Sequence, residues 1–425
     1  MRLDGACGDP WSRLAARCRG DRVEGTPGAD LRQRTQLPAL TGLRFLAALF
    51  VVLYHVAIAG GPAPLRCVYL GYSGVSFFFI LSGFILTYTY IAPGGGPRAS
   101  RVAFWGARVA RICPIYFVAL AIGIGPYLWS HDPRATPLLT GLGAMTFTQA
   151  WFPWSADAWN GPSWSLSAEV FFYALFPYLA SPIARLSRRQ LNLAANLFWA
   201  LGISAAVVYI LINPDHLSTW GSADTTWVRV LRFNPLVRLP EFLLGVALGR
   251  MFVLDRAKAQ YSRRRGWVCS LAALGVLAAI VLAPSSGIPL PAVLVDDGML
   301  DPIFAVLIYS LAWGQGIVAR IFALPALVAL GEASYALYLL HVPLRLYLSH
   351  VLAAPGAGTV WWPIYWGGYV CICLGLSVAA YRWIERPARR GVRRAFEHRS
   401  ARAGASRQAL RPLQGYVPGS IGEQP

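Results

Sequence analysis

The sequence predicts an all-α integral membrane protein, a polytopic bundle of helices. Three observations predict it: hydrophobic residues make up 56% of the 425-residue chain, charged residues only 13%, and long apolar blocks recur along it. Soluble domains carry about 25% charged residues, so a soluble chain of this composition would have too few polar groups to cover its surface. The composition also excludes a disordered protein, a coiled coil and a disulfide-rich secreted scaffold.

Apolar blocks of about 18–25 residues alternate with short polar connections from Leu37 onward, and a helix of that length crosses the ~30 Å hydrocarbon core. We predict ten transmembrane spans, at residues 38–60, 70–91, 112–129, 164–181, 192–212, 235–253, 267–284, 299–318, 329–351 and 362–384. A shorter apolar segment at 138–152 leads into a stretch of Pro, Trp, Asp and Asn. We expect that segment to be re-entrant or interfacial rather than an eleventh crossing.

Basic residues set the predicted orientation of the bundle. The chain carries a net charge of +19 and a single lysine. With both termini in the cytosol, 29 of the 38 basic residues fall in cytosolic segments and only four, Arg66, Arg134, Arg229 and Arg232, in external connections. Cytosolic loops collect Lys and Arg, so this bias favours a multi-pass protein of the plasma membrane with cytosolic termini. Topology and anionic lipid headgroups then explain the positive charge, and nucleic acid is not expected as a partner.

The chain divides into three predicted parts. Residues 1–36 form a disordered cytosolic tail without the apolar run of a signal peptide, and residues 37–385 form the transmembrane domain. Residues 386–425 form a basic, mostly disordered cytosolic tail. The seven cysteines contain no C-x-x-C pair, so neither a metal site nor a disulfide framework is expected.

Two ionisable residues lie in the first predicted span, where a charge in the bilayer costs on the order of 3 kcal/mol and therefore indicates function. Arg44 and His55 leave the same helical face, because eleven residues complete almost three turns, and they lie about 16 Å apart along the axis. Two structural interpretations stay open. Arg44 could snorkel to the inner interface, and His55 could be a satisfied core histidine.

Arg108 and Arg111 lie at the cytosolic entrance of the third predicted span, where the i, i+3 spacing makes them neighbours on one face. With Arg98 and Arg101 they form a cluster of four arginines. Arginine suits bidentate phosphate binding, so the cluster could hold a phosphate-rich cytosolic substrate. Ordinary positive-inside charge is the alternative explanation.

Glu169 enters an apolar helix after a run that contains Ser163, Trp164 and Ser167. A carboxylate with nearby hydroxyls and an indole suits a polar network that orients a substrate or a histidine. No G-x-S-x-G elbow accompanies these serines, so a serine hydrolase is not expected.

Weaker candidates are Tyr335 and His341 in the ninth predicted span, which structural hydrogen bonding would explain equally well. Arg238 and Glu241 stand three residues apart and could neutralise each other. Motifs for an ATPase, a zinc protease or a dinucleotide-binding enzyme do not occur.

Seven motifs together resemble the acyltransferase-3 family, and the resemblance covers about residues 37–390. They are TGLRFLAALFVVLYH (Arg44 to His55), GYSGVSFFFILSGFILT (71–87), the R-x-x-R of Arg108 and Arg111, SWSLSAEVFFYALFP (163–177), RLPEFLLGVALG (238–249), SYALYLLHVPL (334–344) and ERPAR (385–389). Members are multi-spanning enzymes that move acyl groups from acyl-CoA to hydroxyls of sugars, surface polysaccharides or secondary metabolites.

The resemblance implies roles for the candidate residues. His55 matches the family's catalytic histidine, and Arg108 with Arg111 matches the element associated with acyl-CoA. We expect Arg44 to hold the acyl donor or stabilise developing negative charge, and Glu169 to orient or neutralise the site.

The expected function is O-acyl transfer, with acyl-CoA (acetyl-CoA first) as co-substrate and with no bound cofactor or metal. Direct attack by the acceptor and a relay through an acyl-histidine both remain open. The competing function is a transporter in which Arg44, His55 and Glu169 form a proton or substrate relay. The sequence does not specify the acceptor, the acyl length, the side on which the acceptor binds or the oligomeric state.

Overall fold

The computed structural model describes residues 37–61, 71–130, 136–217, 224–257, 268–275, 278, 292–392 and 395, and most of these residues are helical. Among these residues the extended segments form one isolated antiparallel bridge, between Ile91 and Pro97, so the predicted all-α class is confirmed there. The predicted tail at 1–36, half of the span at 267–284 and nearly all of the tail after 392 lie outside the described residues.

Six helices in the described part of the chain are long and apolar enough to cross a membrane. They contain α3 (Pro38–Ile58), α4 (Gly74–Tyr90), α5 (Arg101–Ser130), α7 (Trp164–Ala184), α8 (Arg188–Ile212) and α17 (Trp361–Ala380). Two bent pairs raise the number to as many as eight spans. The first joins residues 292–312 to α14 (Gly316–Phe322) at 86°, and the second joins α15 (Pro325–Glu332) to α16 (Ser334–Val351) at 60°.

The bends divide two predicted spans, 299–318 and 329–351. Gly314 and Gly316 both have positive φ, at 66° and 88°, between α13 (Asp301–Ala312) and α14. Glycine adopts this left-handed conformation without a steric penalty, so the chain turns there instead of continuing as one helix. Upstream, α12 (Ala292–Leu294) leads into a π-helical turn, η5 (Val295–Met299), and then into α13.

The sixth predicted span corresponds to α10 (Pro235–Ala257), which is 23 residues long but carries five charged residues and is not among the six. The count of ten therefore stays a prediction. Two other helices are short. In the predicted re-entrant segment, α6 (Pro137–Met145) has nine residues, about 14 Å of rise, too little to cross. The other is α9 (Thr226–Phe233).

Close contact between α4 and α10 organises the centre of the bundle. A Cβ on Gly83 would lie 2.1 Å from the Phe242 carbonyl oxygen, and one on Gly245 would lie 2.0 Å from that of Ile80. Neither position can hold a side chain, so the two backbones approach directly. Small residues serve this purpose in membrane helices, where packing rather than the hydrophobic effect drives association.

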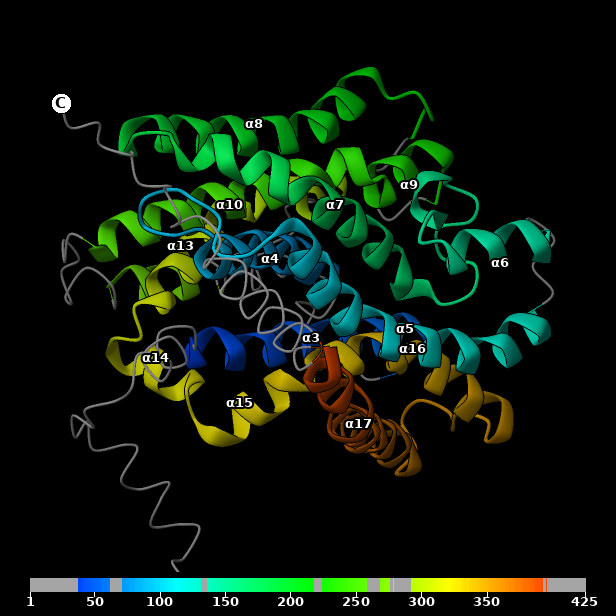
Figure 1. Ribbon diagram of the computed structural model, residues 1–425. Helices are drawn as coiled ribbons and strands as arrows, with labels where there is room; N and C mark the ends of the chain where they lie inside the picture. The colour runs from blue at the N-terminus through cyan, green and yellow to red at the C-terminus, as the bar shows by residue number, and fades with distance from the viewer. Residues whose placement is uncertain are drawn as a thin grey trace, which may run out of the picture. The chain divides into compact units, whose positions relative to one another are not determined.

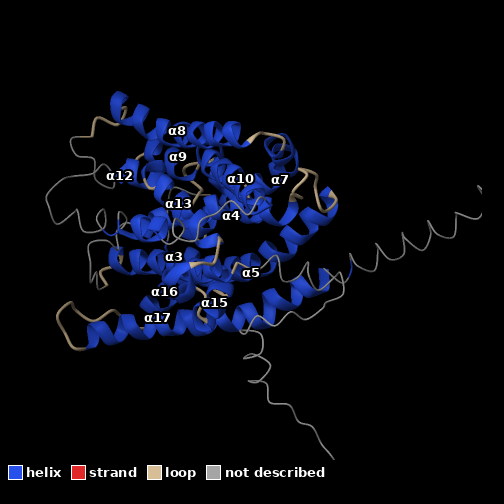
Figure 2. Cartoon of the chain, turned by 90° about the vertical axis from the view of Figure 1, so that its left-hand side faces the viewer, coloured by secondary structure: helices blue, strands red, loops and turns tan. Residues whose placement is uncertain are grey.

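Both views place α7, α8, α9 and α10 on one side of α4, and α3, α15, α16 and α17 on the other (Figures 1 and 2). Helix α3 contacts α4, α13, α14, α15 and α16. The helix that carries Arg44 and His55 is therefore enclosed by other helices.

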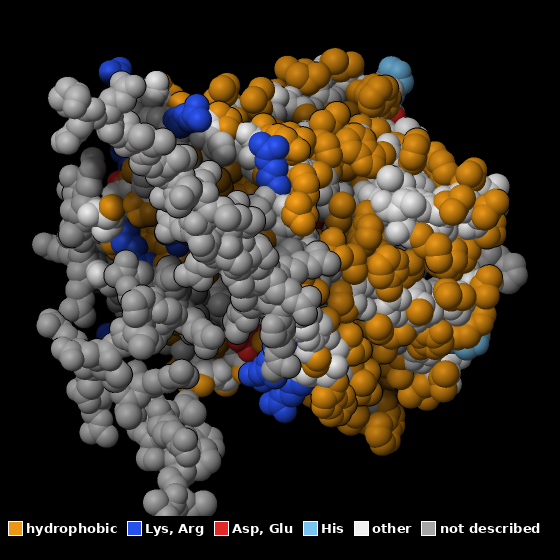
Figure 3. All heavy atoms as spheres, viewed as in Figure 1, with side chains coloured by type: hydrophobic (Ala, Val, Ile, Leu, Met, Phe, Trp, Pro, Cys, Tyr) orange, Lys and Arg blue, Asp and Glu red, His pale blue; other side chains and the backbone are white. Residues whose placement is uncertain are grey.

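Apolar side chains cover the right-hand part of the face drawn in Figure 3, and the visible arginines lie toward its left and lower edge. Apolar side chains such as Leu139, Leu142 and Leu211 are more than half exposed. An apolar surface of this extent is expected of a protein in contact with lipid.

Candidate functional site

Two histidines from distant parts of the chain meet between α3 and α16. His55 lies in the last turn of α3, and His341 lies within α16. Nε2 of His341 is 3.2 Å from Nδ1 of His55, and the ring centroids are 4.8 Å apart. His341 is fully buried. The structure thus pairs the strongest sequence candidate with one of the weakest.

Hydrogen bonds to the backbone assign the protons of this pair. Nδ1 of His55 is 2.8 Å from the carbonyl oxygen of Val51. Nδ1 of His341 is 3.2 Å from the carbonyl oxygen of Leu337. Since a carbonyl only accepts, we assign the hydrogen of each neutral ring to Nδ1. The Nδ1–H of His55 is then shared between the Val51 carbonyl oxygen and Nε2 of His341, which both accept. The lone pair on Nε2 of His55 has no partner among the described residues and is available to a ligand.

Two side chains hold α16 in place around the pair. Tyr369, on α17, donates its hydroxyl to the carbonyl oxygen of His341 at 2.6 Å. Asn160, just before α7, donates its amide to the carbonyl oxygen of Leu339 at 3.0 Å. The position of His341 therefore depends on segments that are distant in sequence.

Arg108 and Arg111 lie more than a turn inside α5, which starts earlier than the predicted span. The guanidinium of Arg108 lies 5.5–5.8 Å from the ring centroids of Tyr90, Phe104 and Tyr173, and it donates to the Tyr90 hydroxyl at 3.3 Å. Its Nε atom is buried without a partner. Aromatic faces thus hold this cation in place while part of its hydrogen-bonding capacity stays unused.

Arg44 and Arg111 form one electrostatic group with Glu169 and Glu385. Arg44 interacts with the charge of Arg111 and with both carboxylates, and Arg111 interacts with the same two carboxylates. Neither arginine makes a direct ion pair with a described residue, although Glu385 pairs with Arg389 at 3.4 Å. This group, called the arginine group below, lies near the start of α3, about 16 Å from His55 along the helix.

Glu169 belongs to the arginine group and does not contact the histidine pair. Its Oε1 accepts from the hydroxyls of Tyr173 and, at 3.1 Å, Ser82. Trp105 donates its indole N–H to the carbonyl oxygen of Tyr173 at 3.0 Å, which ties α5 to α7. The hydroxyls that bind Glu169 are thus not those of the predicted 163–167 run, and its carboxylate acts on the arginines.

Polar atoms of the remaining sequence candidates join backbone segments. Ser167 donates to the carbonyl oxygen of Phe147, and Tyr335 donates to that of Ile112 at 2.8 Å. The carbonyl oxygen of Ser163 accepts from the Gln149 side chain at 3.1 Å. The rings of Trp164 and Tyr72 stack at 6.1 Å. In the structure each of these four candidates therefore contacts other parts of the protein, three through hydrogen bonds and Trp164 through ring stacking.

A second buried ionic cluster centres on Arg238. Its guanidinium pairs with Glu241 at 3.2 Å, as the i, i+3 spacing predicted, and also with Asp297. It donates to the Asp296 carbonyl oxygen at 3.0 Å and to the Ser76 hydroxyl at 2.9 Å. The sequence missed the partners from 296–297 because they follow Arg238 by almost 60 residues.

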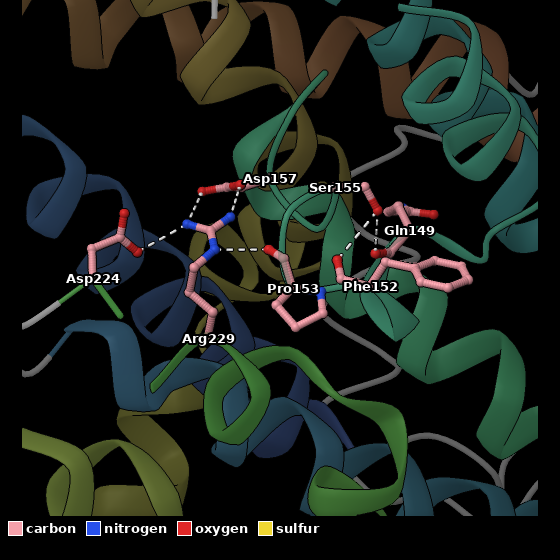
Figure 4. Close-up of polar contacts among 7 residues, drawn as sticks. All are labelled: Gln149, Phe152, Pro153, Ser155, Asp157, Asp224 and Arg229. Carbon is pink, nitrogen blue, oxygen red and sulfur yellow. Dashed lines mark hydrogen bonds and ion pairs between the residues drawn. The ribbon is translucent and has the colours of Figure 1, made fainter. Parts of the chain in front are cut away.

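The segment before α7 is fastened to α9 by one arginine. Arg229 bonds the Pro153 carbonyl oxygen at 2.7 Å and pairs with Asp157 and, at 2.9 Å, Asp224 (Figure 4). Ser155 donates to the Gln149 carbonyl oxygen at 2.9 Å within the same segment. This segment leads to Asn160 and so to the support of α16.

In the described residues, His, Cys, Asp and Glu side chains form no group of three or more that could hold a metal ion. The described chain therefore offers two distinct chemical groups along α3: an imidazole with a free lone pair, and arginines without direct carboxylate partners.

The Acyltransferase domain of the acyltransferase-3 family matches residues 37–382. Acyltransferase MdmB of Streptomyces mycarofaciens is 30% identical over 339 residues, which cover 72% of this chain and 78% of that protein. Peptidoglycan O-acetyltransferase OatA of Listeria monocytogenes is 23% identical over 377 residues, which cover 84% of this chain and 56% of OatA.

Putative O-acetyltransferase SAR0937 of Staphylococcus aureus is 25% identical over 393 residues, which cover 86% of this chain and 59% of that protein. The chain thus spans less than two thirds of SAR0937 and OatA. No solved structure matches. Because the family match extends over most of the chain, the protein belongs to the acyltransferase-3 family of acyltransferases.

Proposed function

We propose that this protein is a membrane O-acyltransferase that moves an acyl group, acetyl in the first instance, from acyl-CoA to a hydroxyl group. The proposal is carried by the arrangement along α3, where His55 presents a free lone pair near one end and Arg44 joins the arginine group near the other. A reaction of acyl-CoA needs both features. Its phosphates are anionic and need cations, and the acceptor hydroxyl that attacks its thioester needs a base.

The arginine group suits the phosphates of coenzyme A. Arg44 and Arg111 have no direct carboxylate partner among the described residues, and guanidinium groups bind phosphate through paired N–H donors. Glu169 and Glu385 neutralise part of this charge, which limits the cost of burying it. Because Arg44 lies about 16 Å from His55, we assign it to donor binding rather than to the reacting atoms.

Chemistry takes place at His55. As the acceptor oxygen attacks the thioester carbonyl carbon, Nε2 of His55 takes the hydroxyl proton and the carbonyl π electrons move onto oxygen. Collapse of the tetrahedral intermediate re-forms the carbonyl and expels the thiolate of coenzyme A, which takes the proton back from His55. Nε2 of His341 accepts a hydrogen bond from the imidazolium and so stabilises it.

His341→Phe is expected to lower kcat by about 10- to 100-fold, because a hydrogen bond to a charged group contributes about 1.5–3 kcal/mol. Steady-state kinetics with acetyl-CoA would measure this, and KM for acetyl-CoA should change little. His341→Gln places an acceptor oxygen near the position of Nε2 and should recover part of the rate. Equal activity in both variants would leave His341 with a packing role only.

The acceptor is proposed from the relatives. OatA is named for peptidoglycan, a carbohydrate polymer, and MdmB is named only as an acyltransferase. We propose a hydroxyl of a carbohydrate, a surface polysaccharide or a secondary metabolite. The two reaction schemes use Nε2 of His55 differently. Direct transfer needs it only as a proton acceptor, whereas an acyl-histidine would use the same lone pair as a nucleophile.

We further propose ten spans with both termini in the cytosol of the plasma membrane. Arg108 and Arg111 then lie on the cytosolic side, where acyl-CoA is available, and His55 lies toward the exterior. The excess of arginines in the predicted cytosolic segments supports this orientation. The apolar surface in Figure 3 supports a location in the membrane.

Acetyl-CoA labelled in its acetyl group tests the reaction class. Purified protein in liposomes would be incubated with the label and with a panel of hydroxyl compounds: peptidoglycan fragments, N-acetylglucosamine oligomers and a macrolide. We expect free thiol to be released in step with labelled ester. A transporter that uses Arg44, His55 and Glu169 as a relay would release no thiol, and that result would replace this proposal with the transport function.

Arg108→Ala combined with Arg111→Ala is expected to raise KM for acetyl-CoA by about 10²- to 10⁴-fold, since two lost charged hydrogen bonds of about 1.5–3 kcal/mol each contribute about 3–6 kcal/mol. The same kinetics would show kcat changed much less. Arg185→Ala with Arg189→Ala removes two exposed arginines and is the matched control for net charge. A KM equal to that of the control would exclude these arginines from donor binding.

A further inference from the structure

Arg345 differs from the buried Arg238 and Arg250 in what surrounds it, and unlike Arg44 and Arg111 it has no carboxylate among its electrostatic neighbours. Arg238 pairs with two carboxylates, and Arg250 donates to the carbonyl oxygens of Ala92 and Pro93. Arg345 makes no hydrogen bond or ion pair with a described residue, and its Nε atom is buried without a partner. It is thus a largely enclosed cation with no counter-ion in the part of the chain that the structure describes.

The position of Arg345 connects it to the histidine pair. It follows His341 by four residues on α16, so both side chains leave the same face of that helix. Its charge acts on His341 and on His55, and its other electrostatic neighbours are the hydroxyls of Tyr365 and Tyr369 on α17. No carboxylate is among these neighbours.

An unpaired cation in a low-dielectric site costs free energy, and next to a neutral base it opposes the protonation of that base. Both effects reverse when an anion forms beside it. The reaction proposed above generates such an anion, because the thioester carbonyl oxygen becomes negative while His55 takes the proton. Preorganised positive charge directed at developing negative charge is commonly the largest contribution to catalysis.

We propose that Arg345 is the oxyanion-stabilising residue of the site, binding the carbonyl oxygen of the acyl group in the tetrahedral intermediate formed at His55. This inference rests on the proposed acyl transfer. It also separates the arginines by role. Arg44, about 16 Å from His55 along α3, and Arg111 on α5 hold the phosphates of the donor. An anionic group on the acceptor is the competing ligand, and it would affect binding of the acceptor instead.

The test compares kcat and KM of Arg345→Gln with those of the wild type, using acetyl-CoA and the hydroxyl compound with the highest wild-type turnover. We expect kcat to fall by about 10²- to 10³-fold, the effect of removing one oxyanion donor, with both KM values within about threefold. Arg345→Lys keeps the charge and should lose less. Arg320→Gln, which changes an exposed arginine on α14, should match the wild type.

Chemical rescue distinguishes a direct role from a packing role. Guanidinium ion at millimolar concentration should restore part of the kcat of Arg345→Ala, whereas methylammonium should restore less. An unchanged kcat in Arg345→Gln, a loss confined to the KM of the acceptor, or no rescue would each overturn the proposal. If Arg345→Gln failed to insert, Arg345→Lys and the rescue would decide. Failure of the wild type to transfer acetyl would instead reject acyl transfer itself.

Discussion

Replacing His55 by glutamine is expected to reduce kcat by about 10²- to 10⁴-fold, the usual contribution of a general base. Glutamine keeps much of the side-chain volume but cannot take a proton at the position of Nε2. The histidine lies at the meeting point of α3 and α16, and its ring bonds Val51 and His341. Initial rates of thiol release at saturating acetyl-CoA would measure the loss.

His350→Gln is the control for this change. His350 is exposed near the end of α16, where its ring stacks on Trp129 at 3.9 Å, away from the pair. We expect it to retain wild-type turnover. The experiment requires that His55→Gln insert and elute from gel filtration like the wild type. A correctly inserted His55→Gln protein with full turnover would remove the base assignment.

Replacing Arg238 by methionine is expected to destabilise the fold by about 3–5 kcal/mol, the cost of breaking a buried ion pair from one side. Both Glu241 and Asp297 are at most 3% exposed, so the change leaves two carboxylates buried without their cation. It also removes the donor that joins α10 to the carbonyl oxygen of Asp296. Thermal unfolding in detergent would report a large loss or no folded protein.

Neutralising the partners tests the cause of that loss. Arg238→Met combined with Glu241→Gln and Asp297→Asn removes the uncompensated charges and should recover much of the lost stability. Arg229→Met is the comparison at the surface, because its partners Asp157 and Asp224 are 42% and 57% exposed. It should cost no more than about 1 kcal/mol. Equal losses in Arg238→Met and Arg229→Met would contradict the importance assigned to burial.

Local sequence predicted the elements that depend on composition and spacing. Apolar block length predicted the helices around Arg44 and Glu169, and helical spacing predicted the Arg238–Glu241 ion pair. The bend after α13 was not predicted, although Gly314 and Gly316 permit the positive φ that it needs. The apolar block around them has the length of one continuous span, and length alone does not indicate a turn.

Contacts between distant segments could not be predicted in the same way. His341 looked like a structural histidine because its partner, His55, is 286 residues earlier in the chain. Arg345 has no signal in the local sequence, since its lack of a carboxylate neighbour among the described residues is a property of the packed helices. Glu169 was expected beside the serines and the indole at 163–167, but its hydroxyl partners are Ser82, which lies 87 residues earlier, and Tyr173.

The separation of the base at His55 from the arginines that bind the donor is the central claim. It is tested most directly by comparing the histidine variant and the arginine variant in one kinetic experiment. Acetyl-CoA would be titrated against thiol release for the wild type, His55→Gln, and Arg108→Ala with Arg111→Ala, all in liposomes. The account predicts that the histidine variant loses kcat at an unchanged KM, while the arginine variant gains KM at a nearly unchanged kcat. The same pattern of change in both variants would contradict it, because His55 on α3 and the arginines on α5 would then not serve separate parts of the reaction.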